Sequence, residues 1–450
     1  QQKLKRKNER QEEFTKYQQQ ILDIQKNIVK LQGEKISERI REAIEAFSQG
    51  DIRKADYILE DAKNDTVEGL NDFISSKEIT EQKRKNVCQN IKELLLRADV
   101  VLADLGKDIK SRKKEAWDCY KTADKVANEV GYNKKDYVEL LFRYGKFLNR
   151  YAYFKEAETV YIRLISLCEE IFGCNEQTAI AYNNIGNVYS NLGNYDKALD
   201  FYNKALEIQE KVLGKEHTDT AASYNNIGLI CDYLGKYDEA LKYHTKALKI
   251  RKKVLGEEHP DTATSYNNIG LICDYLGKYD EALKYHTKAL KIRKKVLGEE
   301  HPDTAASYNN IGNVYSNLGN YDKALEYYEK ALEIRKKVLG EEHPDTAASY
   351  NNIGSAYYKL GKYNKASKNF TRALEIRKKV LDEEHTDTAG SYNNIGLICN
   401  YLGKYDEALE YYEKALKIFQ SKLGSEHSYT KSVIENISLV KAMQKQQSSD

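Results

Sequence analysis

Apolar and polar positions repeat every 42 residues along the chain from Tyr182 onward. In one unit, apolar residues fall at helical spacing on a single stripe: Ala222, Ile227, Cys231 and Leu234. Gly235 follows as a break, and a second helical stripe runs from Ala240 to Ile250. Each unit therefore predicts two amphipathic helices joined by a tight turn, and the chain is expected to be all-α.

One motif marks six copies of this unit. The sequence Tyr-Asn-Asn-Ile-Gly begins at Tyr182, Tyr224, Tyr266, Tyr308, Tyr350 and Tyr392. The loop between hairpins reads Leu-Gly-Glu-Glu-His-Pro-Asp-Thr in its fullest form, where Gly256 suits a left-handed helix end and Pro260 suits the first helical position. Because neighbouring units of this kind bury a shared core, the copies predict a solenoid of stacked hairpins.

The unit resembles the tetratricopeptide repeat, in the 42-residue form of the kinesin light chains, which carries the same Asn-Asn-Ile/Leu-Gly and His-Pro-Asp-Thr signatures. The resemblance covers six repeats over residues 177–428, with a divergent repeat at 135–176. It implies a right-handed superhelical solenoid. It also implies that the first helices of the repeats line a concave groove that binds a peptide or a partner domain.

The residues before the repeats are expected to be helical but irregular. Residues 1–34 keep a heptad spacing for under three heptads and predict one helix, which either self-associates or packs on its own solenoid. Residues 35–134 predict irregular hairpins that look like degenerate repeats, two of them over Ala43–Ala62 and Ala116–Val130. Because the only methionine is Met443, we expect that residues before Gln1 have been removed.

Residues 429–450 predict a cap for the solenoid. The segment Ile434-Glu-Asn-Ile-Ser-Leu-Val copies the first helix of a repeat without a second one. The tail after Met443 is polar and is expected to be disordered.

The composition argues against several classes of function. Lys+Arg 72 against Asp+Glu 69 leaves a net charge of +3, so nucleic acid is not an expected partner. No apolar run of about 18 residues is present, so no membrane span is expected. Seven cysteines contain no CxxC pair, and three occupy one repeat position, as buried thiols do in a reducing cytoplasm: Cys231, Cys273 and Cys399.

The histidines do not predict a metal site. Six lie one per repeat in the loops between hairpins: His217, His259, His301, His343, His385 and His427. Equivalent positions should lie about 10 Å apart, whereas zinc binds nitrogen at about 2.0 to 2.1 Å, so a structural role is expected. His244 and His286 replace an aromatic core residue and are expected to be buried with hydrogen-bond partners. No catalytic residue, cofactor or enzyme activity is predicted.

Basic runs end the second helices, at Arg251-Lys-Lys, Arg293-Lys-Lys, Arg335-Lys-Lys and Arg377-Lys-Lys. One interpretation is that they complement the negative helix terminus, together with nearby glutamates. The other is a phosphate-binding track, which requires residues such as Glu299 and Glu300 to point away.

Adjacent asparagines in each first helix are the main candidate site residues: Asn183, Asn184, Asn225, Asn226, Asn267, Asn268, Asn309, Asn310, Asn351, Asn352, Asn393 and Asn394. Because asparagine disfavours a helix interior, amides recurring at fixed sites require a partner. That partner is either the backbone of a bound peptide or the next repeat, through a hydrogen-bond ladder. One asparagine of each pair could serve each role.

The resemblance implies further groove positions, which are Asn187, Ser190, Asn191, Leu229, Asp232, Tyr233, Leu271, Asp274, Tyr275, Asn313, Ser316, Asn317, Ser355, Tyr358, Lys359, Leu397, Asn400 and Tyr401. Only Lys359 is basic, so the expected ligand is neutral to basic with apolar anchors. Ser223–Ala263 is identical to Ser265–Ala305, which indicates either recent duplication or two equivalent pockets.

Three functions remain open at this point. The first is a cytoplasmic adaptor that binds a polypeptide in its groove. The second is a sensor or regulatory arm of a larger protein with an effector or enzymatic domain upstream. The third is a self-assembling structural protein.

Overall fold

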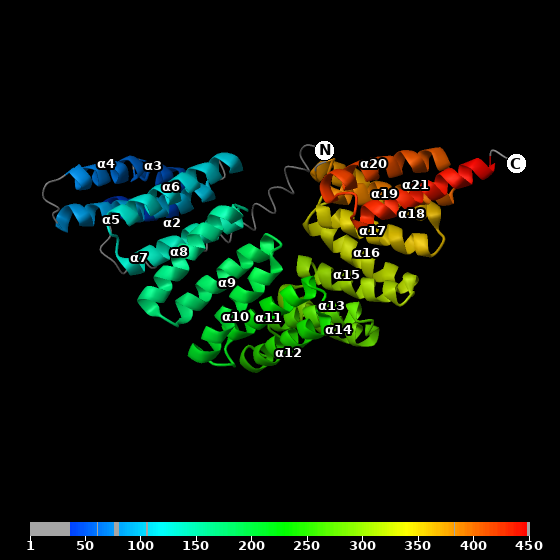
Figure 1. The fold of residues 1–450 in the computed structure, drawn as a ribbon, viewed down its shortest axis with the longest axis horizontal. Helices are drawn as coiled ribbons and strands as arrows, with labels where there is room; N and C mark the ends of the chain where they lie inside the picture. Colours follow the sequence, from blue (N-terminus) through cyan, green and yellow to red (C-terminus); the bar gives the residue numbers. More distant parts are fainter. Residues whose placement is uncertain (1–36, 61, 76–80, 105–106, 382, 448–450) are drawn as a thin grey trace. The chain divides into compact units, whose positions relative to one another are not determined.

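The computed structural model describes residues 37–60, 62–75, 81–104, 107–381 and 383–447, and these ranges hold α-helices and no β-strand (Figure 1). The helix predicted over residues 1–34 lies outside the described residues. The described chain divides into two compact units: an N-terminal unit that ends at Lys236 and a C-terminal unit that begins at Tyr237.

The helices follow one another with short connections. Those of the N-terminal unit are α2 (Glu38–Ser48), α3 (Ile52–Ile58), α4 (Ala62–Ser75), α5 (Glu81–Ala103), α6 (Ile109–Glu129), α7 (Lys134–Arg150), α8 (Phe154–Phe172), α9 (Glu176–Asn191), α10 (Tyr195–Val212) and α11 (Thr218–Tyr233). Those of the C-terminal unit are α12 (Tyr237–Val254), α13 (Pro260–Tyr275), α14 (Tyr279–Leu297), α15 (Pro302–Asn317), α16 (Tyr321–Val338), α17 (Pro344–Lys359), α18 (Tyr363–Val380), α19 (Thr386–Tyr401), α20 (Tyr405–Leu423) and α21 (Ser428–Gln447).

Consecutive helices pack as hairpins, and hairpins stack in chain order. In the N-terminal unit α7 packs on α8 and α9 on α10, while in the C-terminal unit α13, α15, α17 and α19 each pack on the helix that follows. The second helix of each hairpin also packs on the first helix of the next, as α14 does on α15 (Figure 1). The expected all-α fold of stacked helical hairpins is confirmed.

A glycine of the repeated motif sets the distance between the two helices of a hairpin. A Cβ atom on Gly312 of α15 would lie 2.6 Å from Cε1 of Tyr328 on α16. The same close approach brings Gly354 onto Phe370 and Gly396 onto Tyr412. Because no larger residue fits without displacing a buried ring, the glycine lets the helices approach closely.

The loop motif closes each junction between hairpins. Gly298 ends α14 with a positive φ of 95°, and Pro302 begins α15. The Nδ1 atom of His301 accepts a hydrogen bond from the Asp303 N–H at 3.1 Å, and the Thr304 hydroxyl donates to the Gly298 carbonyl at 2.8 Å. The same N-terminal cap recurs at the other loop histidines, which confirms their structural role: His217, His259, His343, His385 and His427.

The irregular N-terminal part forms a small helical packing of its own. α2 and α3 make a hairpin that turns at Gly50, where φ is 81°, and the side chain of Asp51 caps α3. Their apolar faces pack on α5 through buried residues such as Leu59 and Leu96. Ala116–Val130 is not a hairpin, since α6 covers the segment up to Glu129 without a turn and packs on α5. Its sequence contains no glycine or proline that would interrupt a helix.

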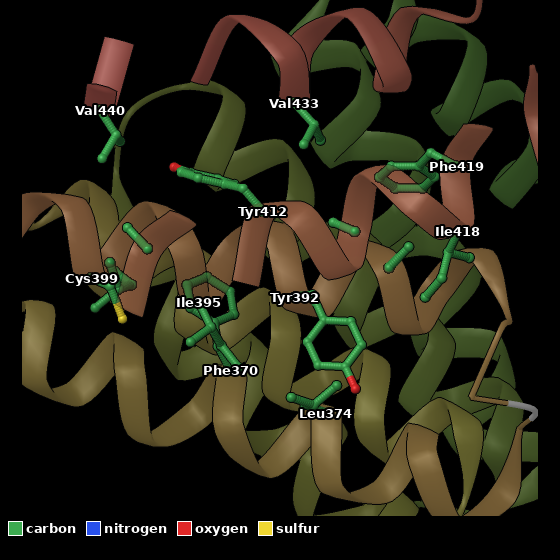
Figure 2. Packing of buried hydrophobic residues seen from close by; sticks show 14 of the residues in the cluster. Phe370, Leu374, Tyr392, Ile395, Cys399, Tyr412, Ile418, Phe419, Val433 and Val440 are labelled. Carbon is green, nitrogen blue, oxygen red and sulfur yellow. The ribbon is translucent and has the colours of Figure 1, made fainter. Parts of the chain in front are cut away.

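The helix α21 caps the last hairpin. It packs on α20 and places Val433 and Val440 in the core cluster that also holds Tyr412 and Phe419 (Figure 2). The helix continues past Met443 to Gln447, where the sequence had predicted a disordered tail. The run Lys441 to Gln447 contains no glycine or proline, so nothing in it ends the helix earlier.

The two core histidines lack the hydrogen-bond partners that we expected. Neither ring nitrogen of His244 or His286 has a partner, although both side chains are buried. By contrast, the Tyr328 hydroxyl, at the equivalent position, donates to Asn313 Oδ1 at 2.8 Å. The residue that corresponds to Asn313 in the repeat of His286 is Leu271, which offers no acceptor. Burial lowers the pKa of His244 and of His286 to about 4.

Candidate functional site

The asparagine pairs form a hydrogen-bond ladder between first helices of the C-terminal unit. The Nδ2 atom of Asn310 on α15 donates to Oδ1 of Asn267 on α13 at 2.9 Å. The same bond recurs along the unit, from Asn352 to Asn309 at 3.0 Å, from Asn394 to Asn351 at 2.9 Å and from Asn436 to Asn393 at 3.3 Å. In the N-terminal unit, Asn183 Oδ1 accepts from the Ser223 hydroxyl at 3.0 Å.

Both asparagines of a pair therefore take part in the ladder, and the two roles are not divided between them. The first asparagine supplies its oxygen and the second supplies its amide nitrogen. The opposite ends of these amides are not used by the ladder, and the side chains are half-buried, as are Asn184, Asn226 and Asn268. Asn225 is buried. Ligand binding by the unused ends stays a prediction.

This geometry predicts different effects of one chemical change at the two positions. Aspartate at the second position loses the donor: Asn310→Asp, Asn352→Asp and Asn394→Asp. Aspartate at the first position keeps an acceptor: Asn267→Asp, Asn309→Asp and Asn351→Asp. Urea unfolding followed by circular dichroism should show that the free energy of unfolding falls by about 1 kcal/mol per site for the variants at the second position alone. Both sets add the same charge, so equal destabilisation would contradict the assigned direction of the ladder.

Exposed tyrosines lie at one groove position. The side chains of Tyr233, Tyr275 and Tyr401 are 62%, 57% and 53% exposed at the ends of α11, α13 and α19. Each ring lies against the tyrosine that begins the second helix of the preceding hairpin, with centroid distances of 5.1 Å to Tyr195, 5.4 Å to Tyr237 and 5.2 Å to Tyr363. An exposed ring that is already packed presents contact area at a low entropic cost.

Asp232 and Asp274 lie one residue before two of these tyrosines. Burial raises the pKa of both carboxyl groups. Asn317 Nδ2 donates to both carboxylate oxygens of Asp274, at 2.9 and 3.1 Å. Within the described residues, neither carboxylate forms an ion pair with a lysine or arginine. Partly desolvated carboxylates of this kind favour a cationic partner.

The remaining predicted site residues are less distinctive. Leu229 and Leu271 are half-buried, and Lys359 is exposed with its Nζ 5.8 Å from the ring centroid of Tyr358. Sequence reasoning missed one pairing, in which Tyr202 donates to Asn187 at 2.6 Å as Tyr328 does to Asn313. The signal was present, since Asn at that groove position occurs with Tyr in the second helix. In the repeat of Tyr412 the residue at this groove position is Leu397, which offers no acceptor, and the Tyr412 hydroxyl has no partner.

The basic runs are part of the junctions between hairpins. Arg293 is buried and donates to the Ser307 hydroxyl at 2.8 Å and to the Asp303 carbonyl at 3.1 Å. Lys294 pairs with Glu299 at 2.8 Å, and Lys337 of the next run pairs with Glu300. The phosphate-track interpretation is therefore wrong, because the glutamates point toward the lysines and neutralise them.

The described residues contain no group of three histidine, cysteine or acidic side chains arranged to hold a metal ion. Cys231, Cys273 and Cys399 are buried, as expected. Within the described ranges, every helix is too short or too polar to cross a membrane.

Comparison with protein families identifies the repeats. The family model described as Tetratricopeptide repeat matches residues 143–211, 177–253, 219–295, 274–337, 303–379 and 387–449. Together these segments cover more than half of the chain. No curated protein sequence matches significantly.

Three solved structures are similar. The apo form of RapI is 20% identical with a TM-score of 0.50, over 63% of this chain and 97% of RapI. A STAND signal-transduction ATPase with a tetratricopeptide repeat sensor, from Pyrococcus horikoshii, is 16% identical with a TM-score of 0.51, over 87% of this chain and 62% of that one. BtubC from P. vanneervenii is 24% identical with a TM-score of 0.41, over 55% of this chain and 92% of its own. The first two show that the fold is shared.

Proposed function

Because this chain belongs to the tetratricopeptide-repeat family, we propose that it is a protein-interaction scaffold whose first helices bind an extended polypeptide. The observation that carries the proposal is the row of half-buried amides on α13, α15, α17 and α19. The ladder uses Oδ1 of Asn267, Asn309 and Asn351 and Nδ2 of Asn310, Asn352 and Asn394. The opposite ends of these six amides offer donors and acceptors at a regular spacing. A peptide backbone has the matching pattern of carbonyl and N–H groups.

The ligand that fits best is neutral to basic and carries apolar anchors. The exposed rings of Tyr275 and Tyr401 supply apolar contact area, and the desolvated carboxylate of Asp274 attracts a lysine or arginine. Lys359 is the only basic residue among the predicted groove positions. The scaffold is proposed to be non-catalytic and cytoplasmic, and self-association through residues 1–34 stays a prediction.

A second candidate is a sensor arm of a larger protein. The STAND ATPase from Pyrococcus horikoshii, whose fold this chain shares, is described as carrying a tetratricopeptide repeat sensor. Characterising the full-length gene product would distinguish the two candidates, since a catalytic or effector domain on the same polypeptide favours the sensor.

A peptide library panned on the whole chain tests the scaffold proposal. We expect recovered peptides to contain lysine or arginine beside apolar residues. Asp274→Asn, which removes the charge at constant shape, should raise the Kd of such a peptide roughly threefold to tenfold, as measured by fluorescence anisotropy. The matched control is Asp322→Asn on α16, a second helix, where the carboxylate side chain is 77% exposed. Equal peptide affinity of both variants would argue against a groove that selects positively charged peptides.

A further inference from the structure

The last junction of the C-terminal unit, between α20 and α21, differs from the junctions before it. At the junction between α18 and α19, Arg377 donates to the Ser391 hydroxyl at 2.7 Å and to the Asp387 carbonyl at 3.0 Å. The residues 42 positions later are Phe419, Val433 and Tyr429. A charged hydrogen-bonded junction is thus replaced by an apolar one, with Phe419 and Val433 buried in one cluster (Figure 2).

Gly390 on α19 has no packing role in the described structure. A Cβ atom built on it would meet no other atom within 4 Å, whereas one on Gly396 would lie 2.9 Å from Tyr412. Its φ is not positive, so no turn requires glycine. The equivalent residues in the other five repeats are Ile180, Ala222, Thr264, Ala306 and Ala348. Glycine inside a helix destabilises it relative to alanine, and close approach of another molecule is one reason to retain glycine.

The open space above Gly390 belongs to a cavity of about 290 Å³. Its walls include Asn393, Asn394, Phe419, Tyr429 and Val433. Tyr429 is 60% exposed and tilts against Phe419 at a centroid distance of 5.6 Å, so the opening has an aromatic rim. A dry cavity of about 150 Å³ already holds a benzene ring, so this one has room for one aromatic side chain.

Two polar groups of the cavity are suited to an uncharged peptide unit. Arg377 already donates to Ser391 and to the Asp387 carbonyl. The ladder uses Nδ2 of Asn394, toward Asn351, and Oδ1 of Asn393, so that Asn393 Nδ2 and Asn394 Oδ1 remain as one donor and one acceptor. A donor and an acceptor beside an apolar wall match a peptide unit that is followed by an apolar side chain.

We propose that this cavity is an anchor pocket for one uncharged aromatic side chain of an extended peptide. The ring inserts over Gly390 against Phe419, and the peptide backbone bonds to the amides of Asn393 and Asn394. The pocket rests on the proposed scaffold function and specifies where its ligand is anchored and by which side chain.

The test uses the whole chain, the panned peptides and two variants that alter the pocket. Gly390→Leu fills the space directly. Phe419→Arg combined with Val433→Ser restores the pair found at the preceding junction. The matched control is Ala306→Leu, which enlarges the equivalent residue two repeats earlier. Urea unfolding should show that Gly390→Leu is at least as stable as the parent chain, because leucine is the better helix former.

We expect the recovered peptides to share an aromatic residue. Their Kd should rise at least tenfold on both pocket variants and less than twofold on Ala306→Leu. Replacing the aromatic residue of the peptide by alanine should weaken binding to the parent chain and have little further effect on Gly390→Leu.

Three outcomes overturn the proposal. Recovery of no peptide by the whole chain contradicts the scaffold function and the pocket together. Peptides that bind Gly390→Leu as tightly as the parent chain leave the scaffold function standing and contradict the pocket alone. If Gly390→Leu instead abolishes only self-association, measured by light scattering, the occupant is a second copy of this chain.

Discussion

Replacing His244 and His286 together by phenylalanine is expected to remove a large part of the acid sensitivity of the C-terminal unit. Between pH 7 and pH 4.5 the parent chain should lose several kcal/mol more stability than the double variant. Phenylalanine is a suitable replacement, because Phe370 occupies the same position in another repeat and packs on Gly354 in the same way.

The direction follows from where each state binds protons. Burial lowers the pKa of both imidazoles to about 4 in the folded chain, while the ordinary value is 6.5. Arg251 and Arg293, on the same helices, lower it further. Below pH 6.5 the unfolded state therefore binds protons that the folded state does not, and stability falls until pH 4 is passed. The gap corresponds to about 3 kcal/mol for each histidine.

Urea unfolding of both proteins at several pH values between 7 and 4.5 measures the effect. The carboxylates are common to both proteins, so the difference between the two curves reports the histidines. Parallel curves would mean that the imidazoles acquire a proton or a partner in the folded chain.

The same substitution at two glycines of the first helices should have opposite effects. Gly312→Ala is expected to destabilise the chain by about 2 kcal/mol, because the new Cβ lies 2.6 Å from a ring that is 4% exposed. Tyr328 cannot yield easily, since its hydroxyl is bonded to Asn313 at 2.8 Å. Gly390→Ala should instead stabilise the chain by up to about 1 kcal/mol, since its Cβ meets nothing within 4 Å.

Urea midpoints of the two single variants, measured against the parent chain, decide this prediction. Both substitutions are made in first helices of the same unit, so helix propensity contributes similarly to each. A destabilising Gly390→Ala would show that the space above Gly390 is filled in solution. A neutral Gly312→Ala would show that the hairpin can open without cost.

Short-range sequence patterns were sufficient to predict the hairpins and their junctions. Helical spacing of apolar residues placed the helices, and the turn glycine, such as Gly235, placed their ends. The loop motif predicted a positive φ at Gly256 and the start of α13 at Pro260, because these depend on single residues and their nearest neighbours. The repeat of 42 residues then required neighbouring hairpins to stack, since one hairpin cannot bury its own apolar face.

Contacts between side chains on different helices were decided by the tertiary structure. From the sequence, the asparagines could bind either a ligand backbone or the next repeat. Only the placement of α13 beside α15 shows that Asn310 bonds to Asn267. It assigned a partner to His286, but the opposing helix presents Leu271, so the imidazole is buried without one. The pocket over Gly390 likewise depends on residues from five helices, α17 to α21. Such features join residues on different helices, from 15 positions apart for His286 and Leu271 to 43 for Asn310 and Asn267. Helical periodicity within one segment carries no information about which residues another helix places against it.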